Sequence, residues 1–128
     1  MSRQRVSSGA PWEATVGYSR AIRVGDRVFV AGTTGIGADG QVIADDAYAQ
    51  AQQAFTIIGE ALAEVGASMS DVVRTRIYVV DITRDGDAVG RAHGEIFQTI
   101  RPAATMIEVK AFIDPVMRVE IELDAIVE

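Results

Sequence analysis

The strict alternation of residue types at the C-terminal end of the chain is the sequence feature that most constrains the fold. Because successive side chains of a β-strand point to opposite faces, this pattern predicts a strand with one buried and one polar face. The apolar set is Met117, Val119, Ile121, Leu123, Ala125 and Val127, and the charged set between them is Arg118, Glu120, Glu122 and Asp124. The chain is therefore expected to contain a sheet that is covered on one side.

Two apolar-rich segments near the start predict a hairpin. Residues 16–24 and 27–34 are separated by Gly25-Asp26, which is a compact turn signal between strands. The following segment, 35–40, spells G-x-G-x-x-G, the fingerprint of dinucleotide-binding loops. That fingerprint needs its last glycine at the start of a helix, whereas residues 41–43 favour a short extended piece. We therefore interpret residues 35–40 as a glycine-rich loop.

A first helix is expected from a cap at Asp45 or Asp46 to about Val65. Its apolar residues recur at steps of three and four and form one stripe, as in an amphipathic helix. Gly66 then supplies a left-handed C-terminal stop. The residues of the stripe are Ala47, Ala51, Phe55, Ile58, Leu62 and Val65.

The second half of the chain predicts a strand, a helix and two further strands. A β-rich run covers residues 72–82, residues 83–86 are expected to turn the chain, and a second helix is expected at about 87–99, before Pro102. The order β-β-α-β-α-β-β predicts an α+β fold in which two helices cover one face of a mixed sheet. We expect one domain over residues 1–128, with residues 1–14 as a loosely ordered N-terminal arm.

Charge and composition narrow the range of partners. The chain has 12 Lys and Arg against 18 Asp and Glu, a net charge of −6, and no cysteine. Nucleic acids and anionic membranes both select clustered basic residues, so neither is an expected partner. The sequence has no apolar run of the ~20 residues that span a membrane. The absence of cysteine fits a cytoplasmic location, and the single histidine, His93, gives no zinc site.

The order of these elements, together with several local strings, resembles the RidA/YjgF family from about Tyr18 to Val127. The matching strings are GYSRAIRVGDRVFVAGTTG, VVRTRIYVVDI, RPAATMIEV and VEIELDAI. The resemblance implies a chorismate-mutase-like α+β fold and a homotrimer with small-molecule clefts between neighbouring subunits. It also implies that no cofactor or metal is used. The deaminases of the family hydrolyse enamines and imines to 2-oxo acids and ammonia.

The resemblance assigns roles to individual positions of the chain. The tyrosine of the family's first strand corresponds to Tyr18, and the backbone at the end of its second strand corresponds to Gly32, with Thr33 beside it. The family's catalytic glutamate corresponds to Glu120, and a carboxylate at a cleft can orient a water or carry its proton. From the alternation alone, Glu120 would instead be a solvated member of an acidic face.

The sequence departs from the family pattern at Ala104. Where the deaminases carry an arginine that grips the substrate carboxylate, this chain has alanine, followed by Thr105 and Met106 in the expected pocket. Loss of a charged partner for the substrate costs about 2–5 kcal/mol of binding free energy. Arg101, three positions upstream, is a candidate substitute for the anion contact.

Three functions remain open at this level. The first is hydrolysis of an enamine, an imine or a related small carbonyl compound, with Glu120 as the catalytic residue. The second is a non-catalytic trimer that binds a small ligand in the same clefts. The third is the endoribonuclease activity with which the family is often labelled, and the acidic charge and the lack of a histidine pair argue against it.

Overall fold

The alternating C-terminal segment forms β6 (Val119–Ile126), an interior strand of a six-stranded sheet with the order β1-β2-β3-β6-β4-β5. The computed structural model describes residues 2–128. β6 pairs antiparallel with β3 (Arg27–Thr33) on one side and with β4 (Val72–Val79) on the other. Its apolar residues from Val119 to Ala125 are at most 1% exposed, so the predicted buried face is confirmed.

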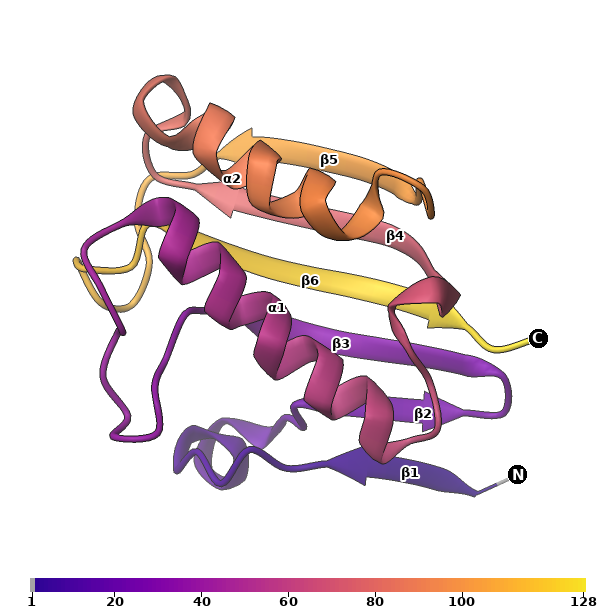
Figure 1. Cartoon of the computed structure of the whole chain (residues 1–128). Helices are drawn as coiled ribbons and strands as arrows, with labels where there is room; N and C mark the ends of the chain where they lie inside the picture. The colour runs from indigo at the N-terminus through magenta and orange to yellow at the C-terminus, as the bar shows by residue number, and fades with distance from the viewer. Residues whose placement is uncertain (1) are drawn as a thin grey trace.

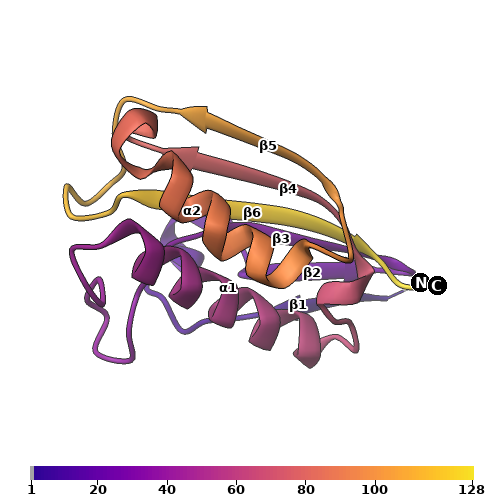
Figure 2. The ribbon, with the colours of Figure 1, turned by 45° about the horizontal axis from the view of Figure 1, so that its top comes forward.

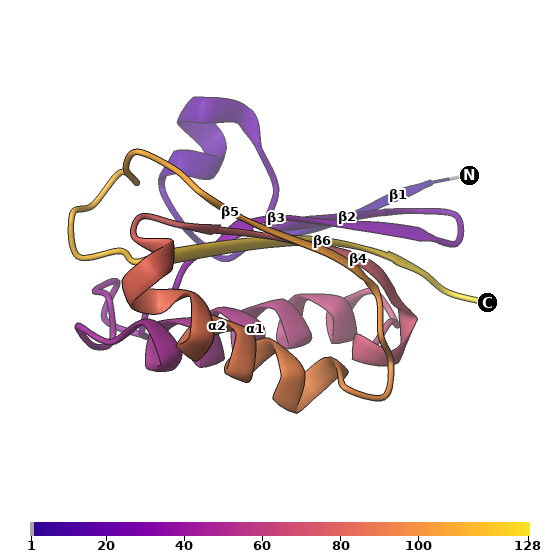
Figure 3. The same cartoon turned by 90° about the horizontal axis from the view of Figure 1, so that it is seen from above.

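The remaining elements complete a two-layer structure. The other strands are β1 (Arg3–Val6), β2 (Ala21–Val24) and β5 (Ala103–Glu108). The helices α1 (Ala47–Glu64) and α2 (Ile82–Phe97) lie on the same face of the sheet (Figures 1 and 3). Only β4 and β5 pair in parallel, so the sheet is mixed. The predicted α+β fold is confirmed, with one strand more than expected.

The first helix follows its sequence signals closely. Asp46 caps α1 by accepting a hydrogen bond from the backbone N–H of Ala49 at 2.9 Å, and Gly66 has the expected positive φ of 74°. Phe55, Ile58 and Leu62 of the predicted stripe are at most 2% exposed against the sheet. Burial of these side chains contributes about 2 kcal/mol each relative to leaving them in water.

The N-terminal segment differs from the loosely ordered arm expected for residues 1–14. Arg3–Val6 pair with β2 as an edge strand, and Val6 is 4% exposed. Two arginines and a glutamine precede the single apolar residue of this strand, so the sequence shows no apolar run there, although charged residues are common on exposed edges. Residues 13–17 form a short π-helix, and the expected strand at 16–24 therefore begins only at Ala21. The start of β1 and the end of β6 lie at the same end of the sheet (Figure 2).

The second helix begins earlier than predicted. Residues 83–86 are not a turn but the first turn of α2, because the side chain of Asp81 accepts from the backbone N–H of Arg84 at 3.0 Å and caps the helix. β4 accordingly ends at Val79 instead of continuing to residue 82. The aspartate before an apolar residue was a helix-start signal, and the β-branched residues around it concealed that signal.

The turns predicted at Gly25-Asp26 and within residues 35–40 are confirmed. Gly25 has a φ of 64° in a two-residue loop, with Val24 paired to Arg27. In the glycine-rich segment 35–40, a turn closes with a 3.0 Å hydrogen bond from Gly40 N–H to the Gly37 carbonyl. α1 begins only at residue 47, so this loop lacks the helix that a dinucleotide site requires.

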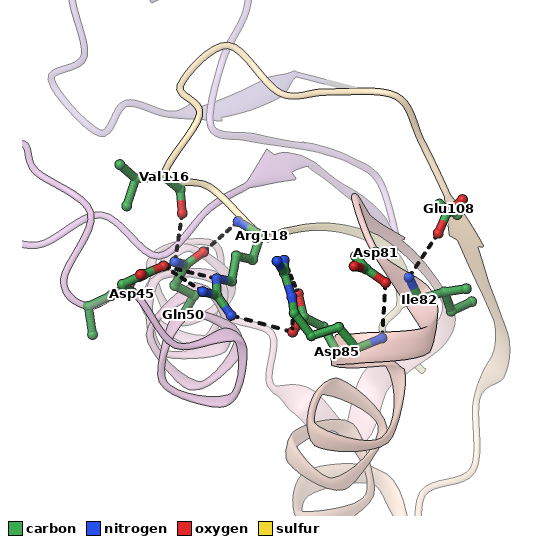
Figure 4. A network of polar contacts seen from close by, with 10 residues as sticks. Asp45, Gln50, Asp81, Ile82, Asp85, Glu108, Val116 and Arg118 are labelled. Carbon is green, nitrogen blue, oxygen red and sulfur yellow. Dashed lines mark hydrogen bonds and ion pairs between the residues drawn. The ribbon is translucent and has the colours of Figure 1, made fainter.

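A polar network joins the starts of both helices to the segment before β6 (Figure 4). Gln50 is fully buried, donates to the carbonyl of Val116 at 2.9 Å and accepts from the backbone N–H of Arg118 at 2.8 Å. The guanidinium of Arg118 then reaches Asp45 at 2.8 Å and Asp85 at 3.5 Å. The network therefore anchors the segment that leads into β6 to the starts of both helices.

Candidate functional site

Gly32 and Glu120 lie in contact on the face of the sheet that the helices leave uncovered. The pairing of β3 with β6 shifts register between Val30 and Thr33, and Gly32 lies within this irregularity. A β-carbon built on Gly32 would lie 2.8 Å from Oε2 of Glu120. The carboxyl group of Glu120 therefore rests directly on the Gly32 backbone, in space that only glycine leaves free.

Arg20 also meets Gly32, and sequence reasoning missed it. Its Nη2 donates to the Gly32 carbonyl at 2.6 Å, and its guanidinium carbon lies 5.8 Å from the centroid of the Tyr18 ring. Residues two apart on an extended chain share a face, so the position two residues after Tyr18 was the available signal. The structure thus brings Tyr18, Gly32 and Glu120 together and adds an arginine.

The electrostatics of Glu120 suit proton transfer. Burial raises the pKa of Glu120 above its ordinary value, the neighbouring Glu122 raises it further, and Arg20 opposes both effects. Burial lowers the pKa of the Arg20 guanidinium, against the influence of Tyr18, Glu13 and Glu120. A carboxyl group with a raised pKa exchanges protons closer to neutral pH than an exposed glutamate does.

Glu120 differs from the other acidic residues of its face. Glu122 accepts a hydrogen bond from the Tyr78 hydroxyl and pairs with Arg76 at 3.6 Å, and Asp124 pairs with Arg76 at 3.4 Å. Among the described residues, no side chain donates a hydrogen bond to Glu120 or pairs with it. Of the three β6 carboxyl groups on this face, that of Glu120 is therefore the one without a hydrogen-bond donor or ion-pair partner among residues 2–128.

The other expected pocket residues lie apart from Glu120. Ala104 pairs with Thr75 on β4, and Met106 packs against the core, so both face the helical layer. Thr105 points the opposite way and lines a hollow of about 110 Å³ with Tyr78. β4 lies between β5 and β6, which separates Ala104 from Glu120 by two strand spacings, about 10 Å, and by the thickness of the sheet. One chain does not bring the two halves of the expected pocket together.

Arg101, the candidate substitute for the anion contact, closes the end of α2. Its backbone has a φ of 54° and its N–H donates to the Phe97 carbonyl at 2.8 Å. Its side-chain Nε donates to the Gln98 carbonyl at 3.0 Å. In the single chain the structure therefore brings Arg101 to the helix end and not to Glu120.

A groove of about 510 Å³ lies on the uncovered face of the sheet. Its lining includes Tyr18, Phe29, Ala31, Glu122 and Asp124. Tyr18 contacts Arg20 and Ala31 precedes Gly32 in the chain, so the groove lies next to the residues that meet at Gly32. No three His, Cys, Asp or Glu side chains within residues 2–128 form a group that could hold a metal ion.

His93 lies in the helical layer, remote from this site. Its Nε2 is 2.9 Å from the Thr75 hydroxyl, and its ring packs against Phe97 with centroids 4.6 Å apart. Burial lowers the pKa of His93 below its ordinary value. The histidine is therefore a packing residue that is held neutral in the folded protein.

Acidification is expected to destabilise the protein through His93. A histidine with a depressed folded-state pKa binds its proton more readily in the unfolded state, so stability falls as the pH drops below about 6.5. The contribution to the slope approaches 1.4 kcal/mol per pH unit at most, an order-of-magnitude limit of about one proton. Urea unfolding between pH 5 and pH 8 would measure it. H93Q is expected to flatten this part of the curve, and an unchanged slope would contradict the assignment.

Comparison with known proteins supplies the family. The chain matches the family described as Endoribonuclease L-PSP over residues 8–127. It is 45% identical over 122 residues to an uncharacterised Streptomyces coelicolor protein, covering 95% of this chain and 90% of that one. It is 34% identical over 125 residues to the 2-iminobutanoate/2-iminopropanoate deaminase of Capra hircus, covering 96% and 90%.

A solved structure extends the likeness to the fold. The crystal structure of Rv2704 from Mycobacterium tuberculosis, described as a YjgF/YER057c/UK114 family member, has a TM-score of 0.90 and 52% identity, covering 98% of this chain and 100% of that one. The architecture is that of α+β proteins in which two helices cover one face of a mixed sheet. The chain belongs to the RidA/YjgF family, whose sequence description is Endoribonuclease L-PSP. Neither helix of the described residues combines the length and apolar character that crossing a bilayer requires.

Proposed function

We propose that the protein is a hydrolase of small imines or enamines, with Glu120 as its catalytic residue. The observation that carries the proposal is the carboxyl group of Glu120, partly buried against Gly32 and not paired within the described chain. Relatives of 30–34% identity named 2-iminobutanoate/2-iminopropanoate deaminase support the choice of reaction. The raised pKa of Glu120 supports its role as a proton carrier.

The proposed reaction needs only water and the chain's own groups. Glu120 takes a proton from a water as the oxygen of that water bonds to the iminium carbon. The nitrogen of the resulting adduct then accepts the proton from Glu120, the carbon–nitrogen bond breaks to release ammonia, and the proton of the adduct's hydroxyl group passes through Glu120 to that ammonia. A carbonyl compound and ammonium are the products, so the atoms and charge of the iminium ion and water are conserved.

We propose that the site is completed between copies of the chain in a homotrimer. Ala104 and Met106 face away from Glu120 in the single chain, so a pocket containing all three needs a second copy. The edge strand β5 offers a surface for it, with Ile107 46% exposed and the nearby Ile113 78% exposed. Both exposures are large for isoleucine, and apolar surface of this kind favours association.

The oligomeric state gives a direct prediction. Light scattering of the purified protein is expected to give a mass of three times 13.7 kDa. A mass of 13.7 kDa at micromolar concentration would contradict both the trimer and the shared cleft.

The decisive experiment separates hydrolysis from binding. Imines of small 2-oxo acids and uncharged imines are offered to the protein, and ammonia is measured against the uncatalysed rate. Release above that rate supports hydrolysis. Stabilisation against heat by intact compounds without any release supports the alternative, a non-catalytic trimer that binds a small ligand.

Two further proposals, an endoribonuclease activity and a cytoplasmic location, depend on the net charge and on the lack of cysteine. A net charge of −6 disfavours RNA, so the endoribonuclease activity is the least supported function. Absence of RNA binding at low salt would remove it. The cytoplasmic location rests on the lack of cysteine alone and stays a prediction.

A further inference from the structure

Arg20 is a partly buried cation of the uncovered face, and among residues 2–128 no acidic side chain lies within ion-pair distance of it. Arg76, on the same face, is by contrast paired with Glu122 and Asp124. Arg20 makes one side-chain hydrogen bond, to the Gly32 carbonyl, and its Nε is buried without a hydrogen-bond partner among residues 2–128. A buried donor on a charged group without a partner costs free energy, so the guanidinium of Arg20 is not fully satisfied by the chain's own groups.

The position of Arg20 suits an anion that belongs to the reacting molecule. Nη2 of Arg20 is 2.6 Å from the Gly32 carbonyl, and the carboxyl of Glu120 lies against the same glycine. A molecule seated at Gly32 can therefore touch the guanidinium with one group and the carboxyl with the next. In a 2-imino acid the carboxylate carbon is bonded directly to the imine carbon, so the two groups are one bond apart.

We infer that Arg20 provides the anion contact of this site, in place of the residue that Ala104 does not supply. The guanidinium is a planar donor that stays charged at any physiological pH and binds a carboxylate in a defined orientation. Arg20 is thus a specificity-determining residue, and it selects imines whose reacting carbon carries a carboxylate. The claim that Arg20 selects the imines that react rests on the proposed function. The claim that Arg20 binds a carboxylate does not.

The test compares two ligands that differ only in charge. 2-Oxobutanoate carries the carboxylate, and 2-oxobutanamide replaces it by a neutral amide of the same shape. Dissociation constants are measured by ligand-observed NMR on the intact protein, with no turnover required. The wild type is expected to prefer the carboxylate, and R20M is expected to reduce that preference at least about 30-fold.

Two further variants sharpen the result. R76M removes a cation from the same face that is already paired, and it is expected to leave the preference within about threefold of the wild type. R20K keeps the charge and loses the planar fork, and it is expected to fall between wild type and R20M. R20K also carries the test if the melting curve of R20M shows that this variant does not fold.

Three outcomes would overturn the inference. They are a wild type without preference for the carboxylate, an unchanged preference in the Arg20 variants, and an equal loss of affinity for both ligands. The last would assign Arg20 to holding the Gly32 carbonyl. The proposed function fails separately: a wild type that binds the carboxylate through Arg20 and releases no ammonia from any imine keeps the inference and loses the hydrolase.

Discussion

E120Q is expected to lower kcat for ammonia release at least about a hundredfold, the range that a general acid–base group contributes. The amide has nearly the shape of the carboxyl group, so it fits against Gly32, but it can neither accept a proton from water nor return one to nitrogen. Because the substitution removes proton transfer more than binding, KM is expected to change little. Steady-state kinetics on the imine with the highest rate would measure both constants.

E122Q is the matched control for this prediction. It makes the same chemical change two residues further along the same face, where the carboxylate is already held by Tyr78 and Arg76. Its kcat is expected to stay within about threefold of the wild type. Because burial raises the pKa of Glu120, the acidic limb of the kcat/KM profile should lie above the ordinary glutamate value of about 4.3. Equal losses in E120Q and E122Q would contradict a catalytic role specific to Glu120.

Q50L is expected to lower the free energy of unfolding by about 3 kcal/mol, the largest effect on stability that we predict. The side chain of Gln50 is fully buried and satisfies three backbone groups: it donates to the carbonyls of Ala44 at 2.8 Å and Val116 at 2.9 Å and accepts from Arg118 N–H at 2.8 Å. Leucine fills a similar volume and removes the hydrogen-bond partner of all three groups. Urea unfolding at pH 7.5 would measure the loss.

Q52L provides the comparison for Q50L. Gln52 lies on the same helix, but it is exposed and bonds only to the Tyr48 hydroxyl. The same substitution there is expected to change stability by no more than about 0.5 kcal/mol. A loss below about 1 kcal/mol in Q50L would mean that water or a shift of the loop replaces its hydrogen bonds.

The periodic parts of the fold could be predicted from the sequence, and the parts without a clear period could not. The alternation of β6 and the stripe of α1 are repeated many times, so they predicted the sheet and the first helical layer. β1 offers one buried residue, Val6, which is too short a run to display a period. Asp81 lies among β-branched residues that concealed its helix-start signal, and the hydrogen bond from Arg84 N–H identifies it as a cap.

The candidate site was predictable only in part, for a geometric reason. Tyr18, Gly32 and Glu120 come from three separate stretches of sequence, and only the family resemblance assigned them to one site at the sequence level. Arg20 lies inside an apolar-rich run that is typical of an ordinary strand, and nothing in that run indicates that its side chain reaches the Gly32 carbonyl. Ala104 and Glu120 belong to opposite faces of one sheet, and no pattern along a chain reports which surfaces of two copies will meet.

The contact between Gly32 and Glu120 makes these two positions mutually dependent in evolution. A methyl group at 32 would collide with the glutamate carboxyl, so alanine is tolerable there only after position 120 has shortened or turned away. Either change at 120 would move the acid–base group from its place against residue 32. A sequence that keeps the carboxyl group in this place is therefore expected to keep glycine at 32.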